Sequence, residues 1–188
     1  MGADIVVHSA TKYLGGHGDL IAGAVVGQAA MMEKIRLYGL KDMTGAVISP
    51  INVFLILRGV KTLQLRMERH CDNAEAVVGF LQGHPGVTAV HYPGLPGHPN
   101  HEVAARQMRR FGGMVAFRVR GGEDVATKVC AETTLWTLGE SLGGVESLIE
   151  HPGRMTHASV AGTELEVPSD LIRLSVGIED VEDLIADL

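Results

Sequence analysis

Residues 4–19 read DIVVHSATKYLGGHGD, and this stretch decides how the rest of the chain is interpreted. Residues 5–7 form a short run of β-branched apolar side chains, which is typical of a buried strand. Glycines at positions 15, 16 and 18 follow and are poorly suited to continuing a strand. The chain turns apolar again over residues 20–26. This pattern predicts that Lys12 lies on a tight connection between two buried strands.

The end of a strand is where ligand sites gather in α/β proteins. A lysine held among apolar strands loses hydration, which favours its uncharged, nucleophilic form, and such a lysine can form a Schiff base with an aldehyde. Ser9 and Thr11 lie three residues and one residue before it, where their hydroxyls can bind the oxygens of a phosphate. The alternative is a solvated loop lysine with glycines that only serve the turn, since most lysines are exposed. The glycines do not form the phosphate-binding pattern G-x-x-x-x-G-K-[ST].

The composition excludes several classes of protein. The chain has 188 residues, of which 46% are hydrophobic and 20% charged, and its net charge is −6 with no basic block, which argues against a nucleic-acid partner. Two cysteines, Cys71 and Cys130, do not make a disulfide framework, so we expect a reducing, cytoplasmic environment. We find no cationic-then-apolar leader and no apolar stretch of the roughly 20 residues that a membrane span needs. We expect both ends of the sequence to be cut points within a longer chain.

The helical pattern suggests a division of the chain into two parts. Residues 51–57 are apolar on nearly every side, which predicts a helix that is buried on all faces or lies at a subunit contact. We expect Gly59 to break this helix and a second helix, over about residues 60–82, to lead into another domain. Residues 1–62 therefore form one part and residues 63–188 an α+β part. Its expected strands lie at 87–92, 114–120, 135–138 and 171–176.

An arginine, Arg173, stands inside the apolar strand pattern LIRLSVG, and an unpaired buried charge there is very costly. Its natural partner is a carboxylate, either an internal Asp or Glu or the carboxylate of a substrate. Lys41 and Asp42, in the loop GLKDMTGA, either reach a neighbouring site or are solvated. The histidines do not show metal-ligand spacing, so we expect no metal site. We expect His8 and His17 to settle the loop by hydrogen bonding.

A desolvated lysine, neighbouring hydroxyls and an arginine for a carboxylate together indicate an amino-acid enzyme that uses pyridoxal phosphate. The string HSATKYLGGHGD at 8–19 resembles the cofactor-lysine motif of the Cys/Met-metabolism family of such enzymes. Further strings resemble the same family in the same order along the chain: RGVKTLQLRMERH at 58–70, HYPGLPGHP at 91–99, ESLGGVESLIEHP at 140–152, MTHAS at 155–159 and IRLSVGIED at 172–180.

The resemblance implies an α/β fold: the end of the large cofactor domain of a fold-type I pyridoxal-phosphate transferase, followed by a smaller α+β C-terminal domain. It implies that Lys12 bonds covalently to the cofactor and moves protons, and that Ser9 and Thr11 bind its phosphate. It also implies that Arg173, with Ser141 beside it, anchors the substrate α-carboxylate. The cofactor is an electron sink that stabilises a carbanion at Cα, which allows a sulfur group to leave from Cγ.

Within the family, two features favour different activities. The string KDMTGAV at 41–47 resembles methionine γ-lyases, where the pair matching Lys41 and Asp42 lies near the site. Glu140 resembles cystathionine enzymes, where an acid can meet the far ammonium of cystathionine. The longer string favours γ-elimination of methionine to methanethiol, 2-oxobutanoate and ammonia. Cystathionine γ-lyase or γ-synthase activity, or a truncated, non-catalytic interaction module, are the alternatives.

Members of the family are about twice as long as this chain, and their sites are completed by a second subunit. The resemblance therefore implies a homo-oligomer, a tetramer built from dimers, acting on a small sulfur amino acid without nucleic acid or membrane. We expect the isolated 188-residue polypeptide to be inactive or nearly so.

Overall fold

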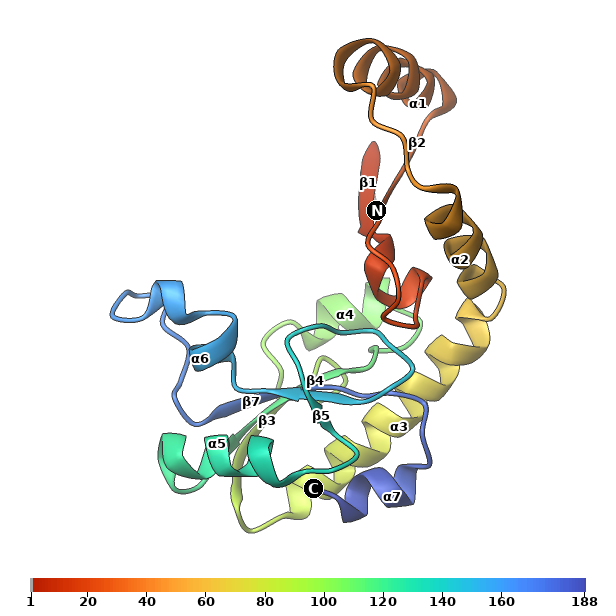
Figure 1. The fold of residues 1–188 in the computed structure, drawn as a ribbon. Helices are drawn as coiled ribbons and strands as arrows, with labels where there is room; N and C mark the ends of the chain where they lie inside the picture. Colours follow the sequence, from red (N-terminus) through yellow and green to blue (C-terminus); the bar gives the residue numbers. More distant parts are fainter. Residues whose placement is uncertain (1) are drawn as a thin grey trace. The chain divides into compact units, whose positions relative to one another are not determined.

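The computed structural model describes residues 2–188, and the chain divides into two compact units, Met1–Leu63 and Gln64–Leu188. Each unit contains its own sheet (Figure 1). The elements of the first unit are β1 (Ile5–Ser9), the helical turn η1 (Ala10–Leu14), β2 (Gly23–Gly27), α1 (Ala29–Lys34), the helical segment η2 (Ile35–Thr44) and α2 (Pro50–Val60). Those that follow are α3 (Leu63–Gly83), β3 (Val87–His91), α4 (His101–Gln107), β4 (Met114–Val119), α5 (Gly122–Glu132), β5 (Thr137–Leu138), β6 (Leu148–Glu150), α6 (Pro152–Met155), η3 (Ala158–Val160), β7 (Leu171–Ser175) and α7 (Val181–Ala186).

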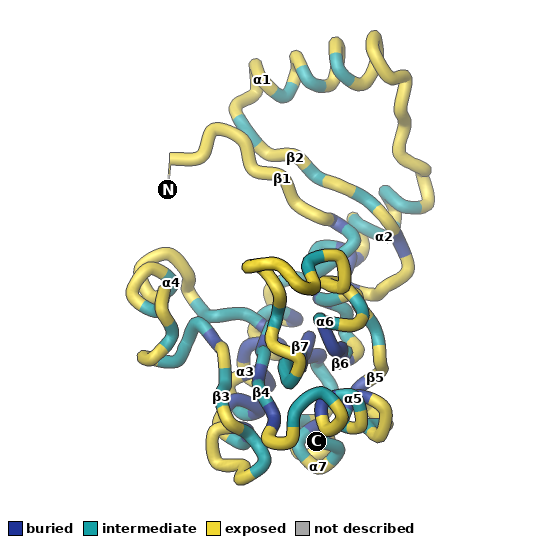
Figure 2. The backbone as a smooth tube through the Cα atoms, turned by 90° about the vertical axis from the view of Figure 1, so that its left-hand side faces the viewer, coloured by how far each residue is buried: buried dark blue, intermediate teal, exposed yellow. Residues whose placement is uncertain are grey.

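The first unit is built on an antiparallel hairpin of β1 and β2, paired from Ile5 opposite Gly27 to Ser9 opposite Gly23. The two expected strands are present, but the prediction that they are buried is wrong for the described residues. The side chain of Val7 is 74% exposed and that of Val26 57% exposed. A two-stranded sheet presents side chains on both faces, and most of those on β1 and β2 are left open, as Figure 2 shows.

Helix α2 begins after Ser49 with Pro50 in its first turn, a position where proline costs no helical hydrogen bond. The expected break between two helices is present, but it lies at residues 61–62, between the end of α2 at Val60 and the start of α3 at Leu63, and not at Gly59, which lies within α2. Gly59 is buried, and a Cβ atom there would lie 2.3 Å from the carbonyl oxygen of Gly15. The glycine therefore permits the helix to approach the connection that carries Lys12.

Several apolar side chains of α2 are left largely uncovered by residues 2–188, contrary to burial on all faces. Ile51, Phe54 and Leu57 are each more than 60% exposed. The prediction of a subunit contact at this helix remains a prediction.

The second unit contains a mixed five-stranded sheet in the order β3-β4-β7-β6-β5. All neighbouring strands are antiparallel except β5 and β6, which are parallel. The strands expected at 87–92, 114–120, 135–138 and 171–176 correspond to β3, β4, β5 and β7. Strand β6 was not expected, because only three residues separate two irregular stretches.

One face of this sheet forms the core. Val115, Phe117 and Val119 alternate inward on β4, opposite Ile172 and Leu174 on β7. Helices α3, α5 and α7 contribute buried side chains to the same cluster and gather on one side of the sheet (Figure 1). Because side chains alternate along a strand, Arg173 and Glu150 belong to the opposite face. The core therefore fixes which face of the sheet is available for chemistry.

Within residues 2–188, no helix combines the length and apolar character needed to cross a bilayer. Cys71 and Cys130 are buried and are not joined in a disulfide.

Candidate active site

The candidate site residues fall into two groups, one in each unit. Lys12 lies on η1, immediately after the end of β1. Its backbone (φ −87°, ψ −131°) interrupts the helical turn, and the amides of Gly15 and Gly16 close the turn by donating to the carbonyls of Ala10 and Lys12 at 2.9 and 2.8 Å. The lysine is half-buried. We refer to residues 10–16 as the lysine turn.

The two hydroxyls beside Lys12 differ in their availability. Ser9 is exposed at the end of β1. The Thr11 hydroxyl is already engaged: it donates to the carbonyl of Ala22 at 3.3 Å and accepts from the amide of Ala22 at 3.0 Å. The amine and the Ser9 hydroxyl fit an aldehyde cofactor that carries a phosphate. Thr11 fits it only by exchanging its bonds to Ala22.

A hollow of about 160 Å³ lies beside the lysine turn, between the glycine-rich loop and α2. It is lined by His17, Asp19, Leu55, Arg58 and Gly59. Nδ1 of His17 lies 2.8 Å from the carbonyl oxygen of Gly15, which confirms that this histidine settles the loop by hydrogen bonding.

Lys41 and Asp42 lie on η2 in the same unit. Their side chains are 74% and 56% exposed, and Nζ of Lys41 lies 3.6 Å from Oδ1 of Asp42. This is the solvated arrangement, and a pair exposed to this degree contributes little to stability.

The second group surrounds Arg173, at the centre of β7. Its Nη1 atom lies 2.8 Å from Oε1 of Glu150, the residue directly opposite on β6. Its Nη2 atom donates to the carbonyl oxygens of Glu140 and Ser141 at 3.0 and 2.8 Å. The structure therefore joins the three predicted substrate-binding residues Glu140, Ser141 and Arg173. It also identifies Glu150 as the internal acid partner of the arginine.

Sequence reasoning missed Glu150. The sequence feature that could have identified it is a single acidic residue that follows the apolar residues Leu148 and Ile149 and precedes the His–Pro pair at 151–152. Glu150 is fully buried, and burial raises the pKa of its carboxyl group, although Arg173 and the hydrogen bond from Thr156 act in the opposite direction. The Thr156 hydroxyl donates to Oε1 at 3.2 Å.

Hydrogen bonds fix the loop that carries Glu140 and Ser141 at several points along its length. The amide of Gly143 donates to the hydroxyl of Ser175 at 2.9 Å. Further along, Ser147 donates to the carboxylate of Glu179 through its amide and its hydroxyl, at 2.5 and 2.9 Å. The Ser147 hydroxyl in turn accepts from the amide of Gly177 at 2.8 Å. The loop is therefore anchored to the end of β7, close to Arg173 in the sequence.

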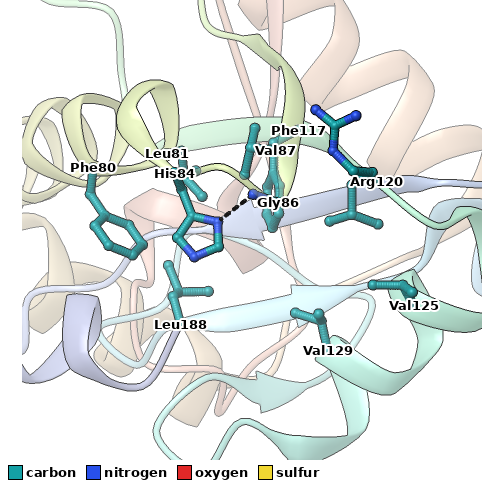
Figure 3. Close-up of a pocket in the computed structure, with 11 residues that line it drawn as sticks. Phe80, Leu81, His84, Gly86, Val87, Phe117, Arg120, Val125, Val129 and Leu188 are labelled. Atoms are coloured by element: carbon teal, nitrogen blue, oxygen red, sulfur yellow. Dashed lines mark hydrogen bonds between the residues drawn. The ribbon is translucent and has the colours of Figure 1, made fainter.

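An apolar cavity of about 110 Å³ lies elsewhere in the second unit (Figure 3). Its walls include Phe80, Val87, Val125, Val129 and Leu188. The only hydrogen bond drawn in it joins the amide of Gly86 to Nδ1 of His84 at 3.1 Å. It contains none of the predicted site residues and offers no chemistry for an amino-acid substrate. Among residues 2–188, no cluster of three His, Cys, Asp or Glu side chains is placed to hold a metal ion.

The fold and the lysine turn define a class, that of the pyridoxal-phosphate-dependent enzymes of amino-acid metabolism, and the comparisons name the family. The chain belongs to the Cys/Met metabolism PLP-dependent enzymes, whose family model matches residues 1–188. The α/β fold class and the pyridoxal phosphate cofactor predicted from the sequence are thereby confirmed.

Similar proteins include a cystathionine gamma-synthase of Mycobacterium leprae, 59% identical over 188 residues, and an L-methionine gamma-lyase of Fusobacterium nucleatum subsp. nucleatum, 52% identical over 191 residues. Each match covers all of this chain and 48% of the relative. The crystal structure of metB from Corynebacterium glutamicum matches with a TM-score of 0.93 and 55% identity, covering 99% of this chain and 48% of that one. The chain thus spans about half the length of the relatives it matches.

Proposed function

We propose that this chain supplies the cofactor lysine and the substrate-carboxylate anchor of an enzyme that exchanges or eliminates a sulfur or other leaving group at Cγ of an amino acid. The observation that carries the proposal is the lysine turn, which places the half-buried Lys12 just after the end of a strand, follows the exposed Ser9 in the sequence, and packs through its backbone against the buried Gly59. Family membership supports the same assignment.

In this proposal, Lys12 holds the cofactor covalently and moves protons at Cα and Cβ of the substrate. Ser9 binds the phosphate, and Thr11 joins it when its bonds to Ala22 are exchanged. Arg173 binds the substrate α-carboxylate, with the backbone of Ser141 beside it. Pyridoxal phosphate supplies the electron sink that makes removal of the Cα proton feasible.

Cystathionine synthesis is the first candidate reaction. The cystathionine gamma-synthases among the similar proteins share more sequence identity with this chain than the methionine gamma-lyases do, at 57–59% against 50–52%. Glu140 favours the same candidate, since its backbone contacts Arg173 and its exposed side chain is free to meet the ammonium of a longer substrate. Methionine γ-elimination is the second candidate, supported by the string KDMTGAV at 41–47.

The decisive experiment for the cofactor lysine is Lys12→Ala in the holoenzyme. We expect the variant to lose the visible absorbance of covalently attached cofactor and all turnover, while Lys34→Ala, a lysine on α1, retains both. A Lys12→Ala protein that still holds the cofactor covalently contradicts the proposal.

The choice of reaction is tested on three substrates: methionine, cystathionine, and a γ-acylated homoserine supplied with cysteine. We expect thioether formation from the last pair to be fastest. Glu140→Val should slow it more than methionine cleavage, and Glu146→Val, in the same loop, should leave the ratio unchanged. Faster methionine cleavage by the parent enzyme would favour the second candidate.

We further propose a cytoplasmic homo-oligomer, a tetramer built from two dimers, and an inactive isolated 188-residue polypeptide. The uncovered side chains of β1, β2 and α2 support both proposals, because apolar patches of this kind usually mark an interaction surface. Light scattering measures the assembly. Release of thiol or ketoacid by the purified 188-residue polypeptide would contradict the second proposal.

A further inference from the structure

The environment of Arg173 contains a second acid besides the substrate group that it is proposed to bind. A guanidinium has five N–H donors. In this structure Nη2 donates to two carbonyls and Nη1 contacts Glu150, while Nε is buried and has no hydrogen-bond partner among residues 2–188. One Nη1 hydrogen and the buried Nε hydrogen therefore remain without an acceptor in the described part of the chain. A carboxylate that approaches on the Nη2 side and binds through two parallel bonds must displace or share one of the present acceptors.

Glu150 is held more firmly than the carbonyls that share the arginine. It is fully buried, it lies directly opposite Arg173 in the β6–β7 register, and its Oε1 atom also accepts from Thr156. The two carbonyls belong to the loop at residues 140–141, which is exposed. Glu150 is thus the fixed contact of the guanidinium, and the loop carbonyls are the contacts that a substrate can replace.

We propose that Glu150 is a positioning residue for Arg173: its carboxylate anchors Nη1 against β6, so that the Nη2 side of the guanidinium faces the loop and the incoming substrate α-carboxylate. This inference rests on the proposed function, because it assigns a role to a second residue of the same carboxylate site. Nothing in it requires Glu150 to touch the substrate.

The chemistry of Glu150 makes a conservative variant informative. Burial already favours the neutral form of this side chain, as the raised pKa of Glu150 indicates, so a neutral amide of the same shape should be tolerated in the fold. Glu150→Gln retains an oxygen that can accept from Nη1. Glu150→Ala removes the acceptor and leaves the guanidinium with the two loop carbonyls as its remaining contacts.

The test measures binding of norleucine, which carries an α-carboxylate and no leaving group at Cγ, and of pentylamine, its analogue without the carboxylate. Dissociation constants come from calorimetric titration of the holoenzyme, and thermal denaturation of the cofactor-free protein reports folding. We expect Glu150→Ala to weaken norleucine binding by about tenfold or more and to leave pentylamine binding within about twofold. Glu150→Gln should bind norleucine as tightly as the parent protein or more tightly.

Steady-state kinetics should show the same division, with KM raised in Glu150→Ala and kcat largely retained. Asp170→Asn is the matched control, because the Asp170 carboxylate pairs with Nε of Arg118 on β4 at 2.8 Å, and Asp170 lies just before β7, three residues before Arg173. We expect the control to leave both dissociation constants unchanged.

Three outcomes would overturn the inference: unchanged norleucine binding in Glu150→Ala, equal weakening of norleucine and pentylamine, or Glu150→Gln as weak as Glu150→Ala. Arg173→Ala separates this failure from failure of the proposed function. If Arg173→Ala weakens norleucine binding while Glu150→Ala does not, only the positioning role is wrong. If neither variant affects norleucine, the carboxylate site itself is wrong.

Discussion

Gly59 offers the sharpest test of how α2 supports the lysine turn. A Cβ atom added there would lie 2.3 Å from the carbonyl oxygen of Gly15 and 2.9 Å from that of Leu14, whereas ordinary van der Waals contact begins near 3.4 Å. The neighbours are backbone atoms, so no side chain can rotate away. Gly59→Ala must therefore push the helix and the turn apart by about 1 Å, and overpacking of this kind costs about 1–3 kcal/mol.

The helix propensity of alanine changes the free energy of unfolding in the opposite direction. Alanine is favoured over glycine inside a helix by about 0.5–1 kcal/mol, because the glycine backbone loses more freedom on folding. The matched control is Gly79→Ala, also inside a helix, where an added Cβ meets nothing within 4 Å. We expect Gly79→Ala to gain about 0.5–1 kcal/mol, and Gly59→Ala to lose about 1–2 kcal/mol once both terms are combined.

Hydrogen exchange at individual amides locates the effect. The amides of Gly15 and Gly16 close the lysine turn. A local loss of 1–2 kcal/mol should speed their exchange by about 5–30-fold in Gly59→Ala and not at all in Gly79→Ala. Fluorescence of Trp136, the sole tryptophan and part of the second unit's core, should report unchanged packing there in both variants.

The displacement should also affect the chemistry proposed for Lys12. A misplacement of about 1 Å can cost up to about 100-fold in rate, so Gly59→Ala should lower kcat/KM far more than Gly79→Ala. Equal exchange at Gly15 and Gly16 in the two variants would refute the reasoning, because it would mean that the close approach of α2 does not hold the turn.

Three further outcomes follow from the contacts. Thr11→Val should destabilise the cofactor-free protein by about 1–2 kcal/mol, because the Thr11 hydroxyl makes two hydrogen bonds to the backbone of Ala22. Thr11→Ser, which keeps the hydroxyl, should have the stability of the parent protein, and unchanged urea unfolding of Thr11→Val would contradict this prediction. Burial acts to raise the pKa of Asp187, but bonds from Thr134, Trp136 and Leu135 outweigh it and hold the pKa below its ordinary 3.8. The stabilisation by this carboxylate is therefore fully present above its ordinary pKa and is lost as the pH falls through the lower pKa of the folded protein, so the urea midpoint of Asp187→Asn should fall short of the parent's at pH 7 and approach it in acid. Burial raises the pKa of Cys130 to about 11, so iodoacetamide at about pH 8 should label it only after unfolding, and rapid labelling of the folded protein would be the contrary result.

Local pattern was sufficient for most of the elements. Alternation predicted β4, and the spacing of apolar residues predicted α3, because each pattern repeats over several residues and faces one core. Strand β6 has only three residues, too few for a period to be recognised. The helix break was predicted two residues too early for a different reason: the sequence does not distinguish a glycine that permits close packing from one that ends a helix, and only the position of Gly15 separates the two cases.

The strands of the hairpin show the limit of inference from hydrophobicity. The run Ile5–Val7 correctly predicts extended backbone, since β-branched side chains favour it. Burial depends on what covers the strand, and that information is not in the strand itself. Val7 accordingly remains exposed among the described residues, although its sequence context is that of a buried position.

Two of the side chains proposed to bind ligands already have hydrogen-bond partners within the protein. Thr11 is bonded to Ala22, and Arg173 to Glu150 and to two carbonyls. Binding of a phosphate at Thr11, or of a carboxylate on the Nη2 side of Arg173, must therefore exchange one hydrogen bond for another, and the net gain in free energy is the difference between the two bonds. Such a site discriminates between ligands by their geometry. A ligand that replaces all of the lost hydrogen bonds is bound well, whereas a ligand that leaves a buried donor unpaired binds weakly, because the desolvation of that donor is not compensated. The residues that hold Thr11 and Arg173 in place, Ala22 through its backbone and Glu150 through its side chain, are therefore as much a part of the specificity of the site as the groups that touch the ligand.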